Sequence, residues 1–199
     1  LRSVIREVRP GDFEYQVAAR IEAEFRLRGA SGSSFTPIVG SGPNACILHY
    51  DRYDRRIAAD ELVLMDVGAE VEGYAADVPR TVPASGRFTP RQKRLHDILT
   101  AAQEAGLRAV RPGATFEDVE GKVKETVAAG LQEMGLIAGP SDVHRYLPHG
   151  TSHAVGLDVH DPVPDRRLEA GMVITLEPGI YIPEESLGLR LEDDVLVTE

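Results

Sequence analysis

Two apolar runs in the sequence each end in a carboxylate, at a position where a buried strand is normally apolar. The run 62–68 contains Asp66 and the run 172–179 contains Glu177, and in each run a glycine follows two residues after the acid. An ionised carboxylate buried in a strand is costly unless it is paired, hydrogen-bonded or bound to a metal. The repeated placement therefore indicates that both acids belong to a functional site. It argues against the alternative that each acid merely ends a strand or caps a turn.

A further acid follows each of these runs, in a second strand-like segment. Asp77 follows the segment 74–76, and Glu192 lies within the segment 189–194. If the two parts of the chain that contain these acids face each other, four like charges converge and raise one another's pKa values. Divalent cations among the carboxylates would remove that repulsion, so the four acids predict a metal site.

Three histidines, His149, His153 and His160, lie close together in the sequence. The spacing of the first two resembles a helical zinc pair, but the flanking proline and glycine disfavour a helix and no glutamate follows His149, which excludes an H-E-x-x-H site. One neutral imidazole with four carboxylates suits a two-metal centre of Mn, Co, Fe or Zn better than a single zinc ion. Spacing does not decide which histidine binds metal. The others, together with His49, are expected to contact substrate or to support the ligands.

An internal repeat indicates how these residues are positioned. The tetrapeptide VRPG occurs at 8–11 and again at 110–113, and each copy is followed shortly by Phe-Glu and an amphipathic stretch. Apolar residues at helical spacing predict two helices that end at Gly29 and Gly135. A third helix is expected between them, with its start near Pro90.

The residues after each repeated helix, 33–81 and 143–198, contain short β-like runs broken by glycine and proline. We therefore predict an α+β fold in which residues 1–199 form one domain, built from two pseudo-symmetric αβ half-units with sheets inside and helices outside. We also expect the chain to be a fragment of a longer protein, because it begins at Leu1 rather than at Met and stops at Glu199 just after an apolar alternation.

The composition argues against several classes of protein. The 199 residues are 42% hydrophobic and 27% charged, and the net charge of −10 disfavours binding to nucleic acid or to an anionic membrane. The longest uncharged apolar run is shorter than the ~20 residues of a membrane span, and no basic leader precedes an apolar segment. Cys46 is the single cysteine, so no internal disulfide can form and a reducing compartment, the cytoplasm, is expected.

Several motifs of the chain, in their order along the sequence, resemble those of the pita-bread metallopeptidase family, which includes aminopeptidase P, prolidase and methionine aminopeptidase. Its fold is also called the creatinase fold. The segments that carry the resemblance cover nearly the whole chain and are IVGSG at 38–42, HY at 49–50, LMDVGAE at 64–70, GYAAD at 73–77, HGTSHAVGLDVHD at 149–161, LEPGIY at 176–181 and RLEDD at 190–194.

The resemblance implies a two-metal centre whose five ligands are Asp66, Asp77, His153, Glu177 and Glu192. Asp77 and Glu192 would bridge the two divalent ions, and Asp66 would chelate one of them. Manganese is the metal we expect first, with cobalt, iron or zinc as alternatives. The ligand histidine, which spacing left open, is thus assigned by the resemblance.

The resemblance also implies the groups that act on substrate. His49, His149 and His160 would line the substrate pocket and stabilise the tetrahedral intermediate, and Glu177 would shuttle the proton of the attacking water. Arg190 would lie beside the bridging glutamate and contact substrate. The family commonly has Thr-Arg-Thr after the second aspartate, whereas Pro79 stands in that segment here and is expected to loosen any supporting contact.

The expected activity is removal of the N-terminal residue from peptides whose second residue is proline. Ser152 before His153 favours aminopeptidase P over prolidase, an Xaa-Pro dipeptidase, which is the first alternative. A noncatalytic binding module of the same fold is the second alternative, and the filled ligand positions disfavour it. The expected partners are such peptides, with no nucleic acid and no membrane. The full-length protein would carry a further N-terminal domain and form a homo-oligomer.

Overall fold

The computed structural model describes residues 1–199, and helices and strands alternate along it in two similar halves. The helices are α1 (Arg2–Glu7), α2 (Glu14–Leu27), α3 (Pro90–Ala109) and α4 (Phe116–Glu133), with 3-10 helices η1 (Gly42–Cys46), η2 (Pro140–Arg145) and η3 (Pro183–Glu185). The strands are β1 (Gly32–Ser33), β2 (Ile38–Ser41), β3 (Leu62–Asp66), β4 (Ala69–Glu70), β5 (Arg80–Pro83), β6 (Val173–Leu176), β7 (Gly179–Ile182), β8 (Leu187–Arg190) and β9 (Asp193–Leu196). None of the helices has the length and apolar character needed to cross a bilayer.

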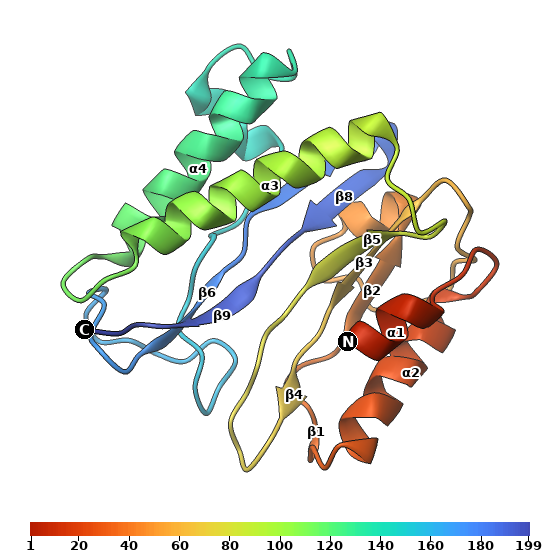
Figure 1. Cartoon of the computed structure of the whole chain (residues 1–199), viewed down its shortest axis with the longest axis horizontal. Coiled ribbons are helices and arrows are strands. Elements are labelled where there is room, and N and C mark those ends of the chain that lie inside the picture. The colour runs from red at the N-terminus through yellow and green to blue at the C-terminus, as the bar shows by residue number, and fades with distance from the viewer.

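Every strand pairs antiparallel within its own half. The first half holds the sheet β2–β3–β5 and the pair β1–β4, and the second half holds the pairs β6–β9 and β7–β8. The halves are joined where Arg190 N donates to Thr81 Oγ1 at 3.0 Å and the Thr81 hydroxyl donates to Arg190 O at 3.1 Å. Figure 1 shows the strands between the helices α1 and α2 on one side and α3 and α4 on the other. The predicted α+β arrangement of inner sheets and outer helices is confirmed.

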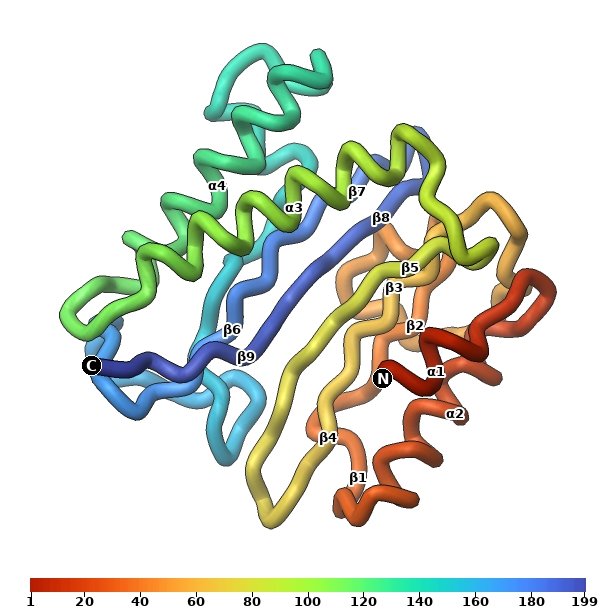
Figure 2. Tube along the Cα trace, in the orientation of Figure 1, coloured from red at the N-terminus to blue at the C-terminus, as the bar shows by residue number.

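The two VRPG segments occupy equivalent places ahead of α2 and α4. Their glycines, Gly11 and Gly113, have φ values of 95° and 83°, in the left-handed region that favours glycine. The Gly11 amide donates to Ile57 O at 2.8 Å, and the Gly113 amide donates to Leu168 O at the same distance of 2.8 Å. The repeat in the sequence is therefore a repeat in the structure, and the tube in Figure 2 shows the chain passing once through each half.

The predicted helical stripes form the core. In the first half, Val17 and Ile21 of α2 are fully buried against Val39, Val63 and Met65 of the sheet. In the second half, α3 and α4 pack on each other and on β7 and β8. The helix residues of that cluster are Leu95, Ile98, Leu99, Ala102, Val123, Val127, Ala128 and Leu131. Apolar burial on both sides of the sheets thus holds the strand ends in place.

The strands occupy less of the chain than predicted. Within 42–61 and 143–172 the structure has 3-10 helices, turns and isolated bridges in place of continuous strands. In 143–172, Pro148, Pro162 and Pro164 lack the amide that strand pairing needs. The short helix α1 was not predicted. Pro79 precedes the first residue of β5, so its missing amide removes no ladder hydrogen bond, and Val78 N still donates to Val67 O at 3.0 Å.

Candidate metal centre

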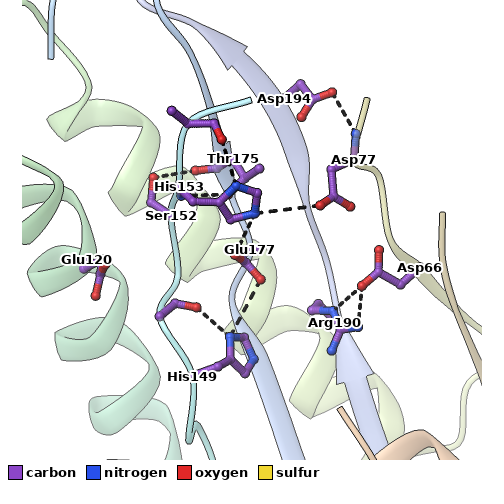
Figure 3. Close-up of polar contacts among 12 residues, drawn as sticks. Asp66, Asp77, Glu120, His149, Ser152, His153, Thr175, Glu177, Arg190 and Asp194 are labelled. Carbon is purple, nitrogen blue, oxygen red and sulfur yellow. Dashed lines mark hydrogen bonds and ion pairs between the residues drawn. The ribbon is translucent and has the colours of Figure 1, made fainter. Parts of the chain in front are cut away.

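Strand ends from both halves bring four acids toward one another. Asp66 is the last residue of β3, Asp77 precedes β5, Glu177 follows β6, and Glu192 lies between β8 and β9. Asp66 and Asp77 are each 7% exposed and Glu192 is 1% exposed. Figure 3 shows Asp66 and Asp77 facing Glu177 and His153 across this space.

The side chains lie close enough to share a metal ion. His153 Nε2 is 3.4 Å from Glu177 Oε1 and 3.7 Å from Asp77 Oδ2. One ligand atom each from Asp77, His153 and Glu192 can be chosen so that all lie within 4.8 Å of one another. Asp66 lies near Asp77, since the charge of Asp66 adds to burial in raising the pKa of Asp77. The structure therefore brings all five expected ligands into one group.

The unpaired atoms of this group fit a divalent metal. Asp66 Oδ1, Asp77 Oδ1 and Glu192 Oε1 are buried and have no hydrogen-bond partner. Buried polar atoms in native proteins are almost always paired, so three orphaned carboxylate oxygens in one place require an external partner. Carboxylate oxygens together with an imidazole nitrogen are the donors that manganese, iron, cobalt and zinc accept.

The electrostatics lead to the same conclusion. Burial, with the charge of Asp66 adding to it, raises the pKa of Asp77 to about 9. Burial also raises the pKa of Glu177 to about 8, although the Arg190 charge opposes this, and it raises the pKa of Glu192 well above its usual range with help from Glu177 and Asp77. Without cations the raised pKa values favour the protonated acids, and bound metal ions would displace those protons.

The hydrogen bonds of His153 leave one ring nitrogen for a metal. Its Nδ1 lies 3.1 Å from Ala154 O, and because a carbonyl oxygen only accepts, Nδ1 carries the hydrogen. Nε2 then keeps its lone pair and faces Asp77 and Glu177. Burial lowers the pKa of His153, which favours the neutral form that binds metals.

The other two histidines of the segment flank this group. His149 Nδ1 is 2.6 Å from Gly150 O, so that nitrogen carries the hydrogen, and Nε2 accepts from the Tyr181 hydroxyl at 2.9 Å. Burial lowers the pKa of His149 to about 4. The ring of His160 meets the ring of His153 edge-on, with centroids 4.3 Å apart. Of the three histidines, His153 has two of the expected carboxylate ligands within 3.7 Å.

A cavity of about 620 Å³ opens over the acids and histidines. Glu192 is absent from its wall and lies buried. The expected site residues on the wall are His49, Asp66, Asp77, His149, His153, His160, Glu177 and Arg190. The structure thus places every one of these side chains where a bound molecule could touch it.

Arg190 has hydrogen-bond partners that the resemblance did not indicate. The resemblance implied that Arg190 lies beside Glu192 and contacts substrate, and in the structure the side chain is 5% exposed and hydrogen-bonded to Asp66 and Tyr181. Its Nε donates to Asp66 Oδ2 at 3.0 Å, and its Nη1 donates to the Tyr181 hydroxyl at 2.5 Å. Arg190 therefore neutralises and orients Asp66, and it still contributes to the cavity wall.

Three residues that support the side chains of the site were not predicted from the sequence. Tyr181 connects His149 and Arg190 through its hydroxyl. Asp194 Oδ2 accepts from Asp77 N at 3.2 Å, and Thr175 Oγ1 accepts from the backbone N of His153 at 3.1 Å. A signal was present for Thr175, a polar residue inside an apolar strand. For the others the signal was proximity to a motif acid.

The glycine that follows each strand acid has a packing reason. A Cβ added at Gly68 would lie 1.6 Å from Ala76 O, so only glycine lets the chain after Asp66 approach the segment that leads to Asp77. A Cβ at Gly179 would lie 2.8 Å from His149 Nε2. Gly68 therefore lets its backbone pass close to the backbone of Ala76, and Gly179 lets its backbone pass close to the His149 ring.

Known proteins similar to this chain were found by sequence. Xaa-Pro aminopeptidase of Escherichia coli is 42% identical over an alignment 211 residues long, which covers 96% of this chain and 48% of that protein. The mitochondrial intermediate cleaving peptidase 55 of Arabidopsis thaliana is 39% identical over 92% of this chain and 39% of its own length. The chain thus spans about half the length, or less, of these curated relatives.

Solved structures are similar over almost the whole chain. Zinc-substituted aminopeptidase P of Escherichia coli, in complex with product, is 39% identical with a TM-score of 0.94, covering 98% of this chain and 49% of that one. Pseudomonas aeruginosa aminopeptidase PepP is 38% identical with a TM-score of 0.94 and coverages of 98% and 49%. The sequence profile of metallopeptidase family M24 matches residues 1–199. With its fold, its carboxylate–histidine group and these similarities, the chain belongs to metallopeptidase family M24.

Proposed function

We propose that this chain is the catalytic domain of a metal-dependent aminopeptidase that hydrolyses the bond between an N-terminal residue and a following proline. The observation that carries the proposal is the convergence of Asp66, Asp77, Glu177 and His153 at one cavity, with Glu192 buried close to Asp77 and His153. Three buried carboxylate oxygens of this group are left unpaired. The choice of substrate is supported by the similarity to proteins named Xaa-Pro aminopeptidase.

We assign two metal ions to Asp66, Asp77, His153, Glu177 and Glu192, with Asp77 and Glu192 shared by both. The compact group that these two acids form with His153, one acid from each half, supports the sharing. When bound, two divalent ions lower the pKa of a water molecule and polarise a carbonyl group. Manganese is our first candidate, and cobalt, iron and zinc suit the same donors.

Glu177 is the group we assign to proton transfer. One of its oxygens lies 3.4 Å from His153 Nε2 and the other lies 3.7 Å from His149 Nδ1, and the carboxylate lines the cavity. Its raised pKa favours a group that takes a proton from the attacking water and passes it to the leaving proline nitrogen. Such general acid–base catalysis contributes ~10²–10⁴-fold to a rate.

His160 and His49 are the donors we assign to the substrate carbonyl oxygen. His149 has both ring nitrogens engaged, by Gly150 O and by Tyr181, so it has no free hydrogen to offer. His160 and His49 line the same cavity. A single preorganised donor to a developing oxyanion is worth ~2.7–4 kcal/mol. His149 then forms part of the cavity wall beside Glu177, fixed by its two hydrogen bonds.

The acidic cavity also suits a free amino terminus. A peptide's α-ammonium group is attracted by a wall that contains Asp66, Asp77 and Glu177. This favours removal of single residues over cleavage inside a chain.

The proposal is tested by hydrolysis of Xaa-Pro and Xaa-Pro-Yaa peptides by the full-length protein. The protein is stripped of metal, assayed, reloaded with manganese and assayed again, with metal content counted in parallel. Cleavage of Xaa-Pro-Yaa that requires metal is the expected result.

Other outcomes would each replace the proposal with a named alternative. Cleavage of the dipeptide alone identifies an Xaa-Pro dipeptidase. Equal cleavage of a matched Xaa-Ala-Yaa peptide shows that proline is not selected. Two bound metals without cleavage of any peptide identify a noncatalytic binding module.

We also place the protein in the cytoplasm. A single cysteine, Cys46, leaves no internal disulfide to stabilise the fold outside a reducing compartment. Cell fractionation with an antibody to the protein tests this, and enrichment in a membrane or secreted fraction would contradict it.

A further inference from the structure

A second buried carboxylate network lies outside the metal centre. Glu14, the first residue of α2, is 0% exposed. Its Oε1 accepts from Ser41 N at 2.7 Å and from Ser41 Oγ at 2.8 Å, and its Oε2 accepts from the Tyr50 hydroxyl at 2.7 Å and from Arg55 N at 3.1 Å. Asn44 Nδ2 lies 3.2 Å from both oxygens. A buried carboxylate with this many donors is held in one orientation.

One of the donors, Tyr50, lines the cavity, and the others lie on neighbouring segments. Ser41 ends β2, Asn44 lies in η1, and Tyr50 and Arg55 lie in the segment 47–55, which has no helix or strand. Four consecutive residues of this segment, 48–51, line the cavity, and His49 is among them. Glu14 therefore connects the scaffold helix α2 to the backbone that carries His49.

The segment 47–55 needs such an anchor because its backbone is not relaxed. Tyr53 has φ of 52°, in the left-handed region that a bulky aromatic residue rarely adopts. Conformations of this kind persist only where surrounding contacts hold them. Here the contacts include the hydroxyl of Tyr53 on Pro37 O and the bonds of Tyr50 and Arg55 to the Glu14 side chain. Two backbone hydrogen bonds also hold the segment, from Glu14 N to Arg55 O at 3.0 Å and from Tyr15 N to Tyr53 O at 3.2 Å.

We propose that Glu14 is a positioning residue that fixes the segment 47–55 and thereby holds the His49 side chain in the cavity. The inference rests on the proposed function in that His49 is there assigned to substrate. Glu14 itself touches neither the metal ligands nor the cavity, because its oxygens are filled by Ser41, Asn44, Tyr50 and Arg55.

Glutamine at this position would disturb the network with little change of shape. Its amide has one acceptor oxygen, and its NH₂ group would face the N–H of Arg55 or of Ser41, both of which can only donate. Tyr50→Phe removes one donor to the carboxylate and the acceptor of the Asp54 amide, and it is the milder change because the carboxylate keeps its other donors. The two substitutions therefore form a graded pair, and the milder one keeps the test informative if Glu14→Gln does not fold.

The kinetic test is a double-mutant cycle on the full-length, metal-loaded protein with an Xaa-Pro-Yaa peptide. Glu14→Gln is expected to lower kcat/KM by about tenfold, and Tyr50→Phe by less. If Glu14 acts through His49, the double variant Glu14→Gln/His49→Ala matches His49→Ala within about twofold. Losses that multiply would show that Glu14 acts independently of His49 and would overturn the inference.

Thr115→Ala is the matched control for stability. Thr115 caps α4 by accepting from Asp118 N at 3.1 Å, far along the chain from the segment 47–55. Its loss lowers the thermal midpoint without touching the cavity wall. The control is expected to retain kcat/KM although its thermal midpoint falls. A control that loses activity equally would show that the Glu14 effect is loss of stability.

Amide hydrogen exchange gives a readout that needs no activity. The amide of Arg55 donates to Glu14 and the amide of Asp54 donates to the Tyr50 hydroxyl at 3.2 Å, so both are protected by the network. Glu14→Gln is expected to speed exchange at these amides and to leave α4 unchanged, whereas Thr115→Ala does the reverse. Unchanged protection at 54 and 55 would overturn the inference. If the wild type cleaves no Xaa-Pro peptide, the proposed function fails while this measurement still decides the role of Glu14.

Discussion

The guanidinium of Arg190, at the end of β8, donates through Nε to Asp66 Oδ2 at 3.0 Å and so connects the second half of the fold to the end of β3 in the first half. Both side chains are buried, at 5% and 7% exposed. The contact occupies one oxygen of Asp66 and leaves Oδ1 unpaired. Arg190 thus turns Asp66 so that a single oxygen remains for a ligand.

Removing Arg190 should destabilise the metal-free protein strongly. Arg190→Ala leaves the Asp66 carboxylate buried without its cation, which typically costs ~3–5 kcal/mol of unfolding free energy. Bound metal supplies replacement charge, so the loss should be smaller in the loaded protein. Urea denaturation with and without manganese measures both values. Arg91→Ala, which breaks a surface pair with Glu185, is the control and should cost only ~0–1 kcal/mol. Equal losses for the two variants would contradict this role for Arg190.

Asp77→Ala and Glu192→Ala should each abolish metal occupancy and activity together. Both acids belong to the compact group with His153, and each has a buried oxygen with no partner in the protein. Elemental analysis of the purified variants, beside a peptide assay, measures the two effects. Glu185→Ala, an acid on the surface beside Arg91, serves as the control and should keep both metals. A variant at position 77 or 192 that keeps two metals and normal turnover would refute the shared-ligand assignment.

His160→Ala and His153→Ala should differ in metal content. The two rings are in contact, with centroids 4.3 Å apart, but only His153 presents a free Nε2 to Asp77 and Glu177. His160→Ala is therefore expected to keep its metals and to lose turnover by ~10²–10³-fold, the effect of one oxyanion donor. His153→Ala should lose metal. Metal loss in His160→Ala instead would mean that ligand and substrate histidine have been exchanged.

The residues of the candidate site could be singled out because they contradict the pattern around them. Asp66 and Glu177 interrupt apolar strands, and an acid in such a place has few explanations. The glycines after these acids are visible in the sequence, but the reason for Gly68, its close approach to Ala76 O, arises only in the folded chain. The repeat of VRPG likewise predicted two equivalent halves.

Contacts between the halves could not be predicted from spacing. Arg190 and Asp66 are far apart in the sequence, and which acid the guanidinium meets depends on how the sheets join at Thr81. Glu14 was hidden for a different reason. At the start of an amphipathic helix an acid is ordinary, since it favours the helix dipole. Only the folded chain shows that Tyr50 and its neighbours enclose it.

The metal-free protein should lose stability as the pH rises from about 7 to about 8.5. Burial and neighbouring charge raise the pKa of Asp77 to about 9 and of Glu177 to about 8 in the fold, whereas both acids are ionised in the unfolded chain over this interval. The fold therefore binds more protons than the unfolded chain, and this stabilisation disappears as the pH rises through the folded values. His149 and His153, with lowered pKa values, are already neutral in the fold. Thermal midpoints across the interval measure the slope, which should flatten in Asp77→Asn and when manganese is added. A midpoint that rises with pH in the metal-free wild type would contradict the raised values.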